Sequence, residues 1–260
     1  MKYPKKSLGQ NFLIDKNIIR KIVNSSKIEG KHIIEIGPGT GNLTDEILKK
    51  KPKSLTLIEK DFSLYKYLKE KYKDDKSLII LNEDILKIDF KMIKKKEAII
   101  FGNLPYNISS QILIKFIKYE KWPPWYKHLV FMFQKELGEK IIGKYLTKNY
   151  SRLSILTNYR LDVEKKFLIS HNCFFPKPKV TSILLHFKPK TKSFFKIKNI
   201  DNLETVTNIV FNNKRKMINK KIKMLLDEIK MKKIDNLKLN SRPADLSPET
   251  YYKITELFEY

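Results

Sequence analysis

Residues 32–41 read His-Ile-Ile-Glu-Ile-Gly-Pro-Gly-Thr-Gly, so a short apolar run passes directly into a glycine-rich turn. The apolar run is typical of a buried strand, and residues 42–51 after the turn have a helical pattern. Glycines at such a turn let the backbone adopt positive φ and approach a ligand closely. The stretch therefore predicts a strand–turn–helix unit of an α/β fold, with a ligand beside the turn.

The same alternation of strands and helices continues through the first 187 residues. Strand-like runs are SLTLIE (54–59), SLIILN (77–82), AIIFGN (98–103), HLVFMFQ (128–134) and TSILLHF (181–187). Helical patterns cover residues 11–28, 61–73, 107–120, 135–146 and 151–160. This alternation predicts a mostly parallel sheet covered by helices on both faces.

The pattern changes after Phe187. Residues 188–199 have the composition of a linker, and residues 201–260 contain helical segments without a clear strand. We therefore expect a catalytic domain at residues 1–187 and a small α-helical domain at residues 188–260.

Polar side chains follow the predicted strands in a regular order. Glu59 ends the second strand, Asp84 follows the third, and Asn103 ends the fourth. Because the carboxyl ends of parallel strands share one edge of the sheet, these side chains are expected to lie beside the glycine turn that contains Gly37. A carboxylate at Glu59 can accept hydrogen bonds from both hydroxyls of a ribose, and one at Asp84 can accept a bond from an adenine amine. The turn lacks the third glycine of the dinucleotide fingerprint. In this order the residues resemble the S-adenosylmethionine site of a Rossmann-like class I methyltransferase.

The acceptor side is predicted at Asn-Leu-Pro-Tyr, residues 103–106. The exocyclic amine of adenine is a poor nucleophile because its lone pair is delocalised into the ring. Asn103 and a backbone carbonyl held by the rigid turn at Leu104 and Pro105 can accept its N–H bonds and free the lone pair. Tyr106 offers a flat ring on which the base can stack. Catalysis would then consist of positioning and polarisation.

Eight segments resemble the bacterial small-subunit rRNA adenine dimethyltransferases: SLGQNFL (7–13), EIGPGTG (35–41), FGNLPYNISS (101–110), FMFQKEL (131–137), YSRLSIL (150–156), FFPKPKV (174–180), FNNKRKM (211–217) and SRPADLSPE (241–249). The resemblance implies a donor pocket made by Asn11, Leu13, Gly37, Glu59, Asp84 and Asn103. It also implies that Asn103 and Tyr106 face the target base and that Phe174 stacks on its other face. Taken by itself, Phe174 beside two prolines fits a position in the core as well as a stacking role. The implied substrate is a pair of adjacent adenines in the 3′-terminal hairpin loop of 16S rRNA, within an immature 30S subunit.

The excess of basic residues favours a partner that carries many negative charges. The chain of 260 residues has a formal net charge of +26, and Lys and Arg displace the counterions that surround phosphates. One cysteine and four histidines without ligand spacing predict no disulfide framework and no metal site. No apolar run is long enough for a membrane span, so we expect a cytoplasmic protein, and nothing indicates more than a monomer.

Four other interpretations share parts of these motifs. A macrolide-resistance methyltransferase that modifies 23S rRNA would share nearly the same catalytic core. A non-catalytic RNA-binding assembly factor, or a mitochondrial transcription factor of the same fold, would have lost catalysis. A DNA adenine methyltransferase would not share the C-terminal motifs.

Overall fold

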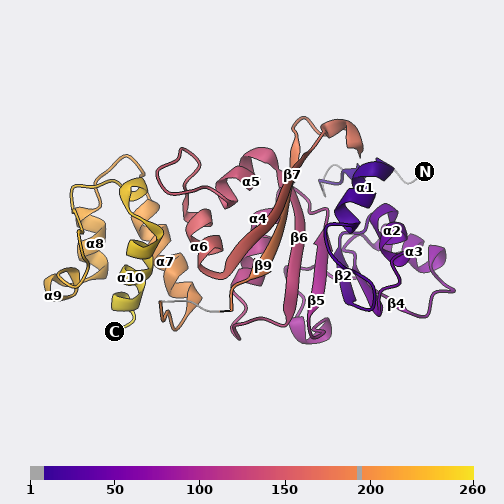
Figure 1. Ribbon diagram of the computed structural model, residues 1–260, viewed down its shortest axis with the longest axis horizontal. Helices are drawn as coiled ribbons and strands as arrows, with labels where there is room; N and C mark the ends of the chain where they lie inside the picture. Colours follow the sequence, from indigo (N-terminus) through magenta and orange to yellow (C-terminus); the bar gives the residue numbers. More distant parts are fainter. Residues whose placement is uncertain (1–8, 192–194) are drawn as a thin grey trace. The chain divides into compact units, whose positions relative to one another are not determined.

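The computed structural model describes residues 9–191 and 195–260 (Figure 1). The first residues of the SLGQNFL motif and part of the predicted linker lie outside the described residues. The chain divides into two compact units. The first comprises the described part of Met1–Phe116 together with Pro123–Gly138 and Val163–Pro189; the second comprises Ile117–Trp122, Glu139–Asp162 and the described part of Lys190–Tyr260.

A seven-stranded sheet runs in the order β4-β3-β2-β5-β6-β9-β7 (Figure 1). Neighbours from β4 to β6 pair in parallel, and β9 pairs antiparallel with β6. The strands are β2 (His32–Ile36), β3 (Ser54–Ile58), β4 (Leu78–Leu81), β5 (Ala98–Gly102), β6 (Tyr126–Gln134), β7 (Leu161–Ile169) and β9 (Ser182–Pro189). The predicted parallel sheet is confirmed, and all six predicted strands are present.

Strand β7 was not predicted. Its two end residues, Leu161 and Ile169, are buried, but the residues between them are mostly exposed and include four charged side chains. The strand lies at the edge of the sheet. Edge strands commonly carry exposed charges that prevent pairing with other chains, and these charges hide the apolar pattern.

The helices of the first unit follow the predicted alternation but are shorter than predicted. They are α1 (Lys16–Val23), α2 (Asn42–Leu48), α3 (Phe62–Lys71), α4 (Ser109–Ile117) and α5 (Lys135–Ile141), of which the last two end beyond the unit. Helix α1 begins late because the Asp15 side chain accepts from the backbone N–H groups of Asn17 and Ile18, which defines an N-cap. Asp61 caps α3 in the same way.

Residues before α1 form a short strand instead of a helical turn. Strand β1 (Phe12–Leu13) pairs antiparallel with β8 (Phe174–Phe175), with Phe12 opposite Phe175 and Leu13 opposite Phe174. This two-stranded ribbon joins the N-terminal motif to the FFPKPKV motif. Leu13 and Phe174 belong to the same buried cluster as residues of β2, β3 and β5.

The second unit is helical. Its helices are α6 (Arg152–Arg160), α7 (Ile200–Phe211), α8 (Asn219–Leu225), α9 (Glu228–Met231) and α10 (Pro248–Phe258). Tyr252 of α10 donates a hydrogen bond to the carbonyl of Ile155 at 3.1 Å, and Tyr150 donates one to Leu246 at 3.0 Å. Because α6 packs with the C-terminal helices in this way, the compact units divide differently from the expected boundary at residue 188. Among the described residues, no helix has the length and apolarity needed to cross a membrane.

Candidate active site

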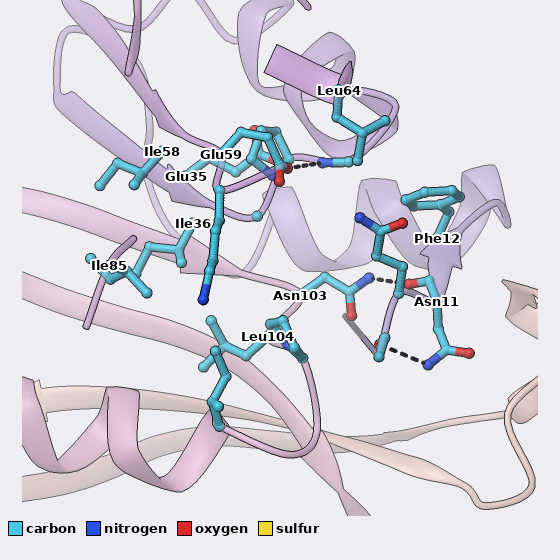
Figure 2. Close-up of a pocket in the computed structure, with 18 of the residues that line it drawn as sticks. Asn11, Phe12, Glu35, Ile36, Ile58, Glu59, Leu64, Ile85, Asn103 and Leu104 are labelled. Atoms are coloured by element: carbon cyan, nitrogen blue, oxygen red, sulfur yellow. Dashed lines mark hydrogen bonds between the residues drawn. The ribbon is translucent and has the colours of Figure 1, made fainter. Parts of the chain in front are cut away.

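A pocket opens at the carboxyl ends of the central parallel strands (Figure 2). Nine of the ten predicted site residues line it: Asn11, Leu13, Gly37, Glu59, Asp84, Asn103, Leu104, Pro105 and Tyr106. They come from the N-terminal ribbon, from the turn after β2 and from the ends of β3, β4 and β5. Glu59, Asp84 and Asn103 thus converge beside the turn that contains Gly37, as parallel pairing of their strands predicts.

The glycine turn has the backbone conformation that its sequence predicts. Gly37, Gly39 and Gly41 have φ values of 66°, 60° and 83°. A Cβ atom on Gly39 would lie 2.8 Å from Cδ1 of Phe12, so the ring of Phe12 packs directly on the turn. Glycine is therefore required at Gly39 both for positive φ and for this close approach.

Glu59 is buried and held by backbone donors. Its Oε1 accepts from the N–H of Asp61 at 2.8 Å, and its Oε2 accepts from the N–H of Gly39 at 3.3 Å. Burial raises the pKa of Glu59 to about 6, against the lowering effect of these hydrogen bonds. At neutral pH the carboxylate is ionised, and it is placed at the pocket wall where it can accept bonds from hydroxyl groups (Figure 2).

Asp84, which follows the neighbouring strand β4, is held by two partners. Its Oδ1 accepts from the N–H of Leu86 at 2.9 Å, and Lys60 Nζ lies 2.8 Å from its Oδ2. Burial alone would raise the pKa of Asp84, but the hydrogen bond and charge of Lys60 outweigh burial, so the pKa lies below its ordinary value. Asp84 is therefore a fixed, ionised acceptor.

The amide of Asn103 is oriented by the N-terminal segment. Its Nδ2 donates to the carbonyl of Asn11 at 2.7 Å, across 92 residues of sequence (Figure 2). Within the described residues no hydrogen bond occupies the Asn103 Oδ1 atom, which leaves that oxygen available as an acceptor. Asn11 thus positions the residue that was expected to polarise an amine.

Tyr106 stands at the end of the acceptor segment. Its hydroxyl lies 2.6 Å from Oγ of Ser182 in β9, and burial raises the pKa of the phenol. The Leu104 side chain is buried, so it contributes packing while its backbone belongs to the turn. The hydrogen bond to Ser182 fixes the orientation of the Tyr106 ring.

Phe174 is the predicted site residue that the structure does not bring to the pocket. Its side chain is 3% exposed and lies in the buried cluster, opposite Leu13 in the ribbon. The adjacent Phe175 is 48% exposed. Alternation along a strand places these two rings on opposite faces, which is why one is buried and the other is not.

Sequence reasoning missed Glu35, which also lines the pocket. The residue is fully buried within β2 and accepts a hydrogen bond of 2.6 Å from Oγ1 of Thr44. Burial raises the pKa of Glu35 to about 8. Its signal in the sequence was an acidic residue inside the otherwise apolar run of residues 32–36. Phe12 and Ser182 carried no comparable signal, because their roles depend on pairing between distant segments.

The sheet order, the glycine turn and the acceptor segment at the end of β5 define a class I methyltransferase fold with its active-site pocket. A sequence model of the family described as "Ribosomal RNA adenine dimethylase" matches residues 1–259. The chain belongs to this family and is a methyltransferase of the rRNA adenine dimethylating type.

Individual relatives agree with this assignment. "Ribosomal RNA small subunit methyltransferase A" of Pelagibacter ubique is 46% identical over 98% of this chain and 97% of its own length. The protein of the same name from Malacoplasma penetrans is 38% identical over 97% of this chain and 91% of its own length. The crystal structure of a dimethyladenosine transferase from Plasmodium falciparum matches with a TM-score of 0.76 and 28% identity, covering 94% of this chain and 95% of that one.

The 23S rRNA methyltransferase ErmE has the same fold. Its structure matches with a TM-score of 0.69 at 20% identity, covering 96% of this chain and all of that chain. At this identity the likeness concerns the fold alone. The small-subunit relatives, at higher identity, define the family relationship.

Proposed function

We propose that this enzyme transfers methyl groups from S-adenosylmethionine to N6 of two adjacent adenines in the 3′-terminal hairpin loop of 16S rRNA. The observation that carries the proposal is the position of the Asn103 amide, which lines the same pocket as the two carboxylates Glu59 and Asp84. The names of the relatives from Pelagibacter ubique and Malacoplasma penetrans support the small-subunit substrate.

The donor half of the pocket fits an adenosine group. Glu59 would accept hydrogen bonds from the ribose hydroxyls, and Asp84 would accept one from the adenine amine of the donor. Gly37 would allow the donor to approach the backbone closely. Asn11 and Leu13 would cover the donor from the N-terminal ribbon, and Asn103 lies between the donor and acceptor halves. When bound, S-adenosylmethionine supplies an electrophilic methyl group.

The acceptor half would prepare the amine of the target adenine for attack. Asn103 Oδ1 and the Leu104 carbonyl would accept its two N–H groups, which draws the nitrogen toward tetrahedral geometry and frees its lone pair. Pro105 restricts the backbone of the turn and so keeps the second acceptor in place. No strong base or covalent intermediate is needed, because the residues position and polarise the amine. The methylated nitrogen is acidic, so the proton that it loses after each transfer would pass to water.

Aromatic side chains would hold the target base in the pocket. Tyr106, oriented by Ser182, offers one stacking surface. A stacking role for Phe174 on the other face requires its ring to leave the buried cluster that it occupies. We propose Tyr106 as the principal stacking partner and Phe174 as a second partner only when the ribbon opens.

The remaining assignments concern the partner of the enzyme. The net charge of +26 favours a ribonucleoprotein with exposed phosphates, and we propose the immature 30S subunit in the cytoplasm as the substrate of a monomeric enzyme. We also propose that residues 1–187 carry catalysis and that residues 188–260 contribute to rRNA recognition.

The proposal is tested with undermethylated 30S subunits and S-adenosylmethionine labelled in its methyl group. The expected result is label in 16S rRNA. No label is expected in 23S rRNA when intact 50S subunits are supplied as the substrate. Label in 23S rRNA alone would instead favour a resistance-type methyltransferase. Binding to 30S subunits without any transfer would favour an assembly factor.

A further inference from the structure

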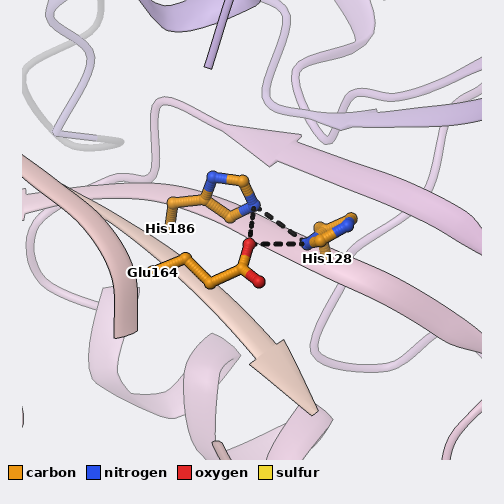
Figure 3. Close-up of side chains that lie close together, drawn as sticks. All are labelled: His128, Glu164 and His186. Atoms are coloured by element: carbon orange, nitrogen blue, oxygen red, sulfur yellow. Dashed lines mark hydrogen bonds and ion pairs between the residues drawn. The ribbon is translucent and has the colours of Figure 1, made fainter. Parts of the chain in front are cut away.

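A cluster of three side chains lies at the antiparallel end of the sheet, formed by His128 of β6, His186 of β9 and Glu164 of β7 (Figure 3). Within the described parts of the chain it is the group of three His, Cys, Asp or Glu residues whose ligand atoms converge closely enough to hold a metal ion. The proposed methyl transfer does not use any of these residues.

The three atoms that face one another form a triangle with one shorter side, between the two imidazole nitrogens. His186 Nε2 lies 2.9 Å from His128 Nδ1, and Glu164 Oε2 lies 3.5 Å from His128 Nδ1 and 3.6 Å from His186 Nε2. Tetrahedral Zn²⁺ sites have ligand distances of about 2.0–2.2 Å, so their ligand atoms lie about 3.3–3.5 Å apart. The triangle therefore needs only small adjustments to hold a zinc ion.

Hydrogen bonding alone leaves this arrangement incompletely satisfied. A single proton can bridge the two imidazole nitrogens, but the Glu164 Oε2 atom then remains about as far from both as a hydrogen bond permits. A cation bound by both imidazoles and the carboxylate would satisfy all three atoms together. The other Glu164 oxygen, Oε1, lies 3.6 Å from Lys188 Nζ.

The surroundings permit entry of an ion and hold the ligands in place. The side chains of His128 and Glu164 are 17% and 34% exposed, whereas His186 is 2% exposed. All three side chains come from adjacent strands in the order β6-β9-β7, which gives them a rigid base. Oγ of Ser26 lies 3.4 Å from His186 Nε2, on a segment outside the sheet.

We propose that His128, Glu164 and His186 bind one zinc-class divalent cation and that this ion ties the edge strand β7 to the sheet. Two imidazoles and one carboxylate suit Zn²⁺ in preference to Mg²⁺ or Ca²⁺, which favour all-oxygen sites. The fourth position would be taken by solvent. The positive charge of Lys188 opposes the ion, but its side chain is half exposed and well screened. The edge strand would gain most from such a tie, because it has a partner on one side only.

The test uses the full-length chain without a polyhistidine tag, stripped of metal with a chelator and then titrated with Zn²⁺ against a chromophoric competitor. Wild type is expected to bind one Zn²⁺ per chain. Glu164→Gln and His128→Gln, both at partly exposed positions, are expected to bind at least about tenfold more weakly. His171→Gln is the matched control because it removes a histidine outside the cluster, and it is expected to bind as wild type.

Two further readouts separate a built site from loose surface binding. Co²⁺ in place of Zn²⁺ is expected to give the intense visible absorption of a tetrahedral ion in wild type and in His171→Gln, and not in Glu164→Gln. Zinc at about 100 times its Kd is expected to raise the Tm of wild type by several degrees and to leave Glu164→Gln unchanged. Equal zinc affinity in wild type and both cluster variants would overturn the proposal, as would the absence of one-to-one binding.

Discussion

Replacing Glu59 by glutamine separates the binding role of this residue from its structural role. The substitution keeps the shape of the side chain and one oxygen acceptor. In wild type the corresponding oxygen, Oε1, accepts from the N–H of Asp61 at 2.8 Å. The substitution removes the negative charge. It also replaces the second oxygen, which accepts from the N–H of Gly39, by an NH2 group. A ribose would therefore lose one charged acceptor.

Glu59→Gln should weaken donor binding and leave the free energy of unfolding nearly unchanged. A hydrogen bond to a charged group contributes about 1.5–3 kcal/mol, so Glu59→Gln should weaken binding of S-adenosylmethionine by about 10- to 150-fold. The pKa of Glu59 rises from 4.5 to about 6 on folding. The ionised form is thus disfavoured in the folded protein, and stability decreases as pH rises from about 4.5 to 6. At pH 7 this costs about 2 kcal/mol. A neutral glutamine would relieve this cost but would lose about 1–3 kcal/mol, because its NH2 group cannot accept from the N–H of Gly39.

Isothermal titration calorimetry and thermal unfolding measure both effects. In wild type the donor affinity should also fall below pH 6, to about one tenth at pH 5, because only that fraction of Glu59 is then ionised. Glu59→Gln should lose this pH dependence, and its Tm at pH 7 should stay close to that of wild type, because relief of the buried charge offsets the lost hydrogen bond from Gly39. A variant that binds the donor as tightly as wild type would refute the ribose role, and one that unfolds at a much lower temperature would refute the account of its buried charge.

Three more substitutions, one of them with a matched control, test the acceptor segment, the glycine turn and the buried cluster. Asn103→Ala should lower kcat by at least about 100-fold while changing donor affinity only a few fold; an active variant in the 30S assay would contradict the polarisation role. Gly39→Ala should destabilise the turn by about 2 kcal/mol or more and weaken donor binding, because Cβ would meet the ring of Phe12. Gly30→Ala, with the same positive φ and open space around its Cβ, should lower the Tm less and leave donor binding unchanged. Phe174→Leu should lower the free energy of unfolding by about 1–1.5 kcal/mol, and an unchanged Tm would contradict its place in the core.

The sequence was sufficient to predict the part of the fold that depends on local pattern. Gly37, Glu59, Asp84 and Asn103 each follow an apolar strand of the parallel sheet, and parallel pairing brings such positions to one edge. Their convergence could therefore be inferred from the sequence alone. Strand bounds also agreed within two residues, because these strands are apolar on both faces.

Features that depend on contacts between distant segments could not be predicted from local pattern. The hydrogen bond from Asn103 to Asn11 spans 92 residues, so the place of Asn11 rested on family resemblance alone. Phe174 had two possible environments, and only the register of β8 against β1 decides which ring is buried. The two histidines at 128 and 186 had no spacing typical of a metal site, and β6 and β9 bring them together only when paired.

The most direct test of the proposed function is nucleoside mass spectrometry of 16S rRNA after complete reaction with undermethylated 30S subunits. The account predicts two residues of N6,N6-dimethyladenosine per subunit, both in the fragment that contains the 3′-terminal hairpin loop. Methylation confined to 23S rRNA, or 16S rRNA that remains unmodified while the donor is bound, would contradict it.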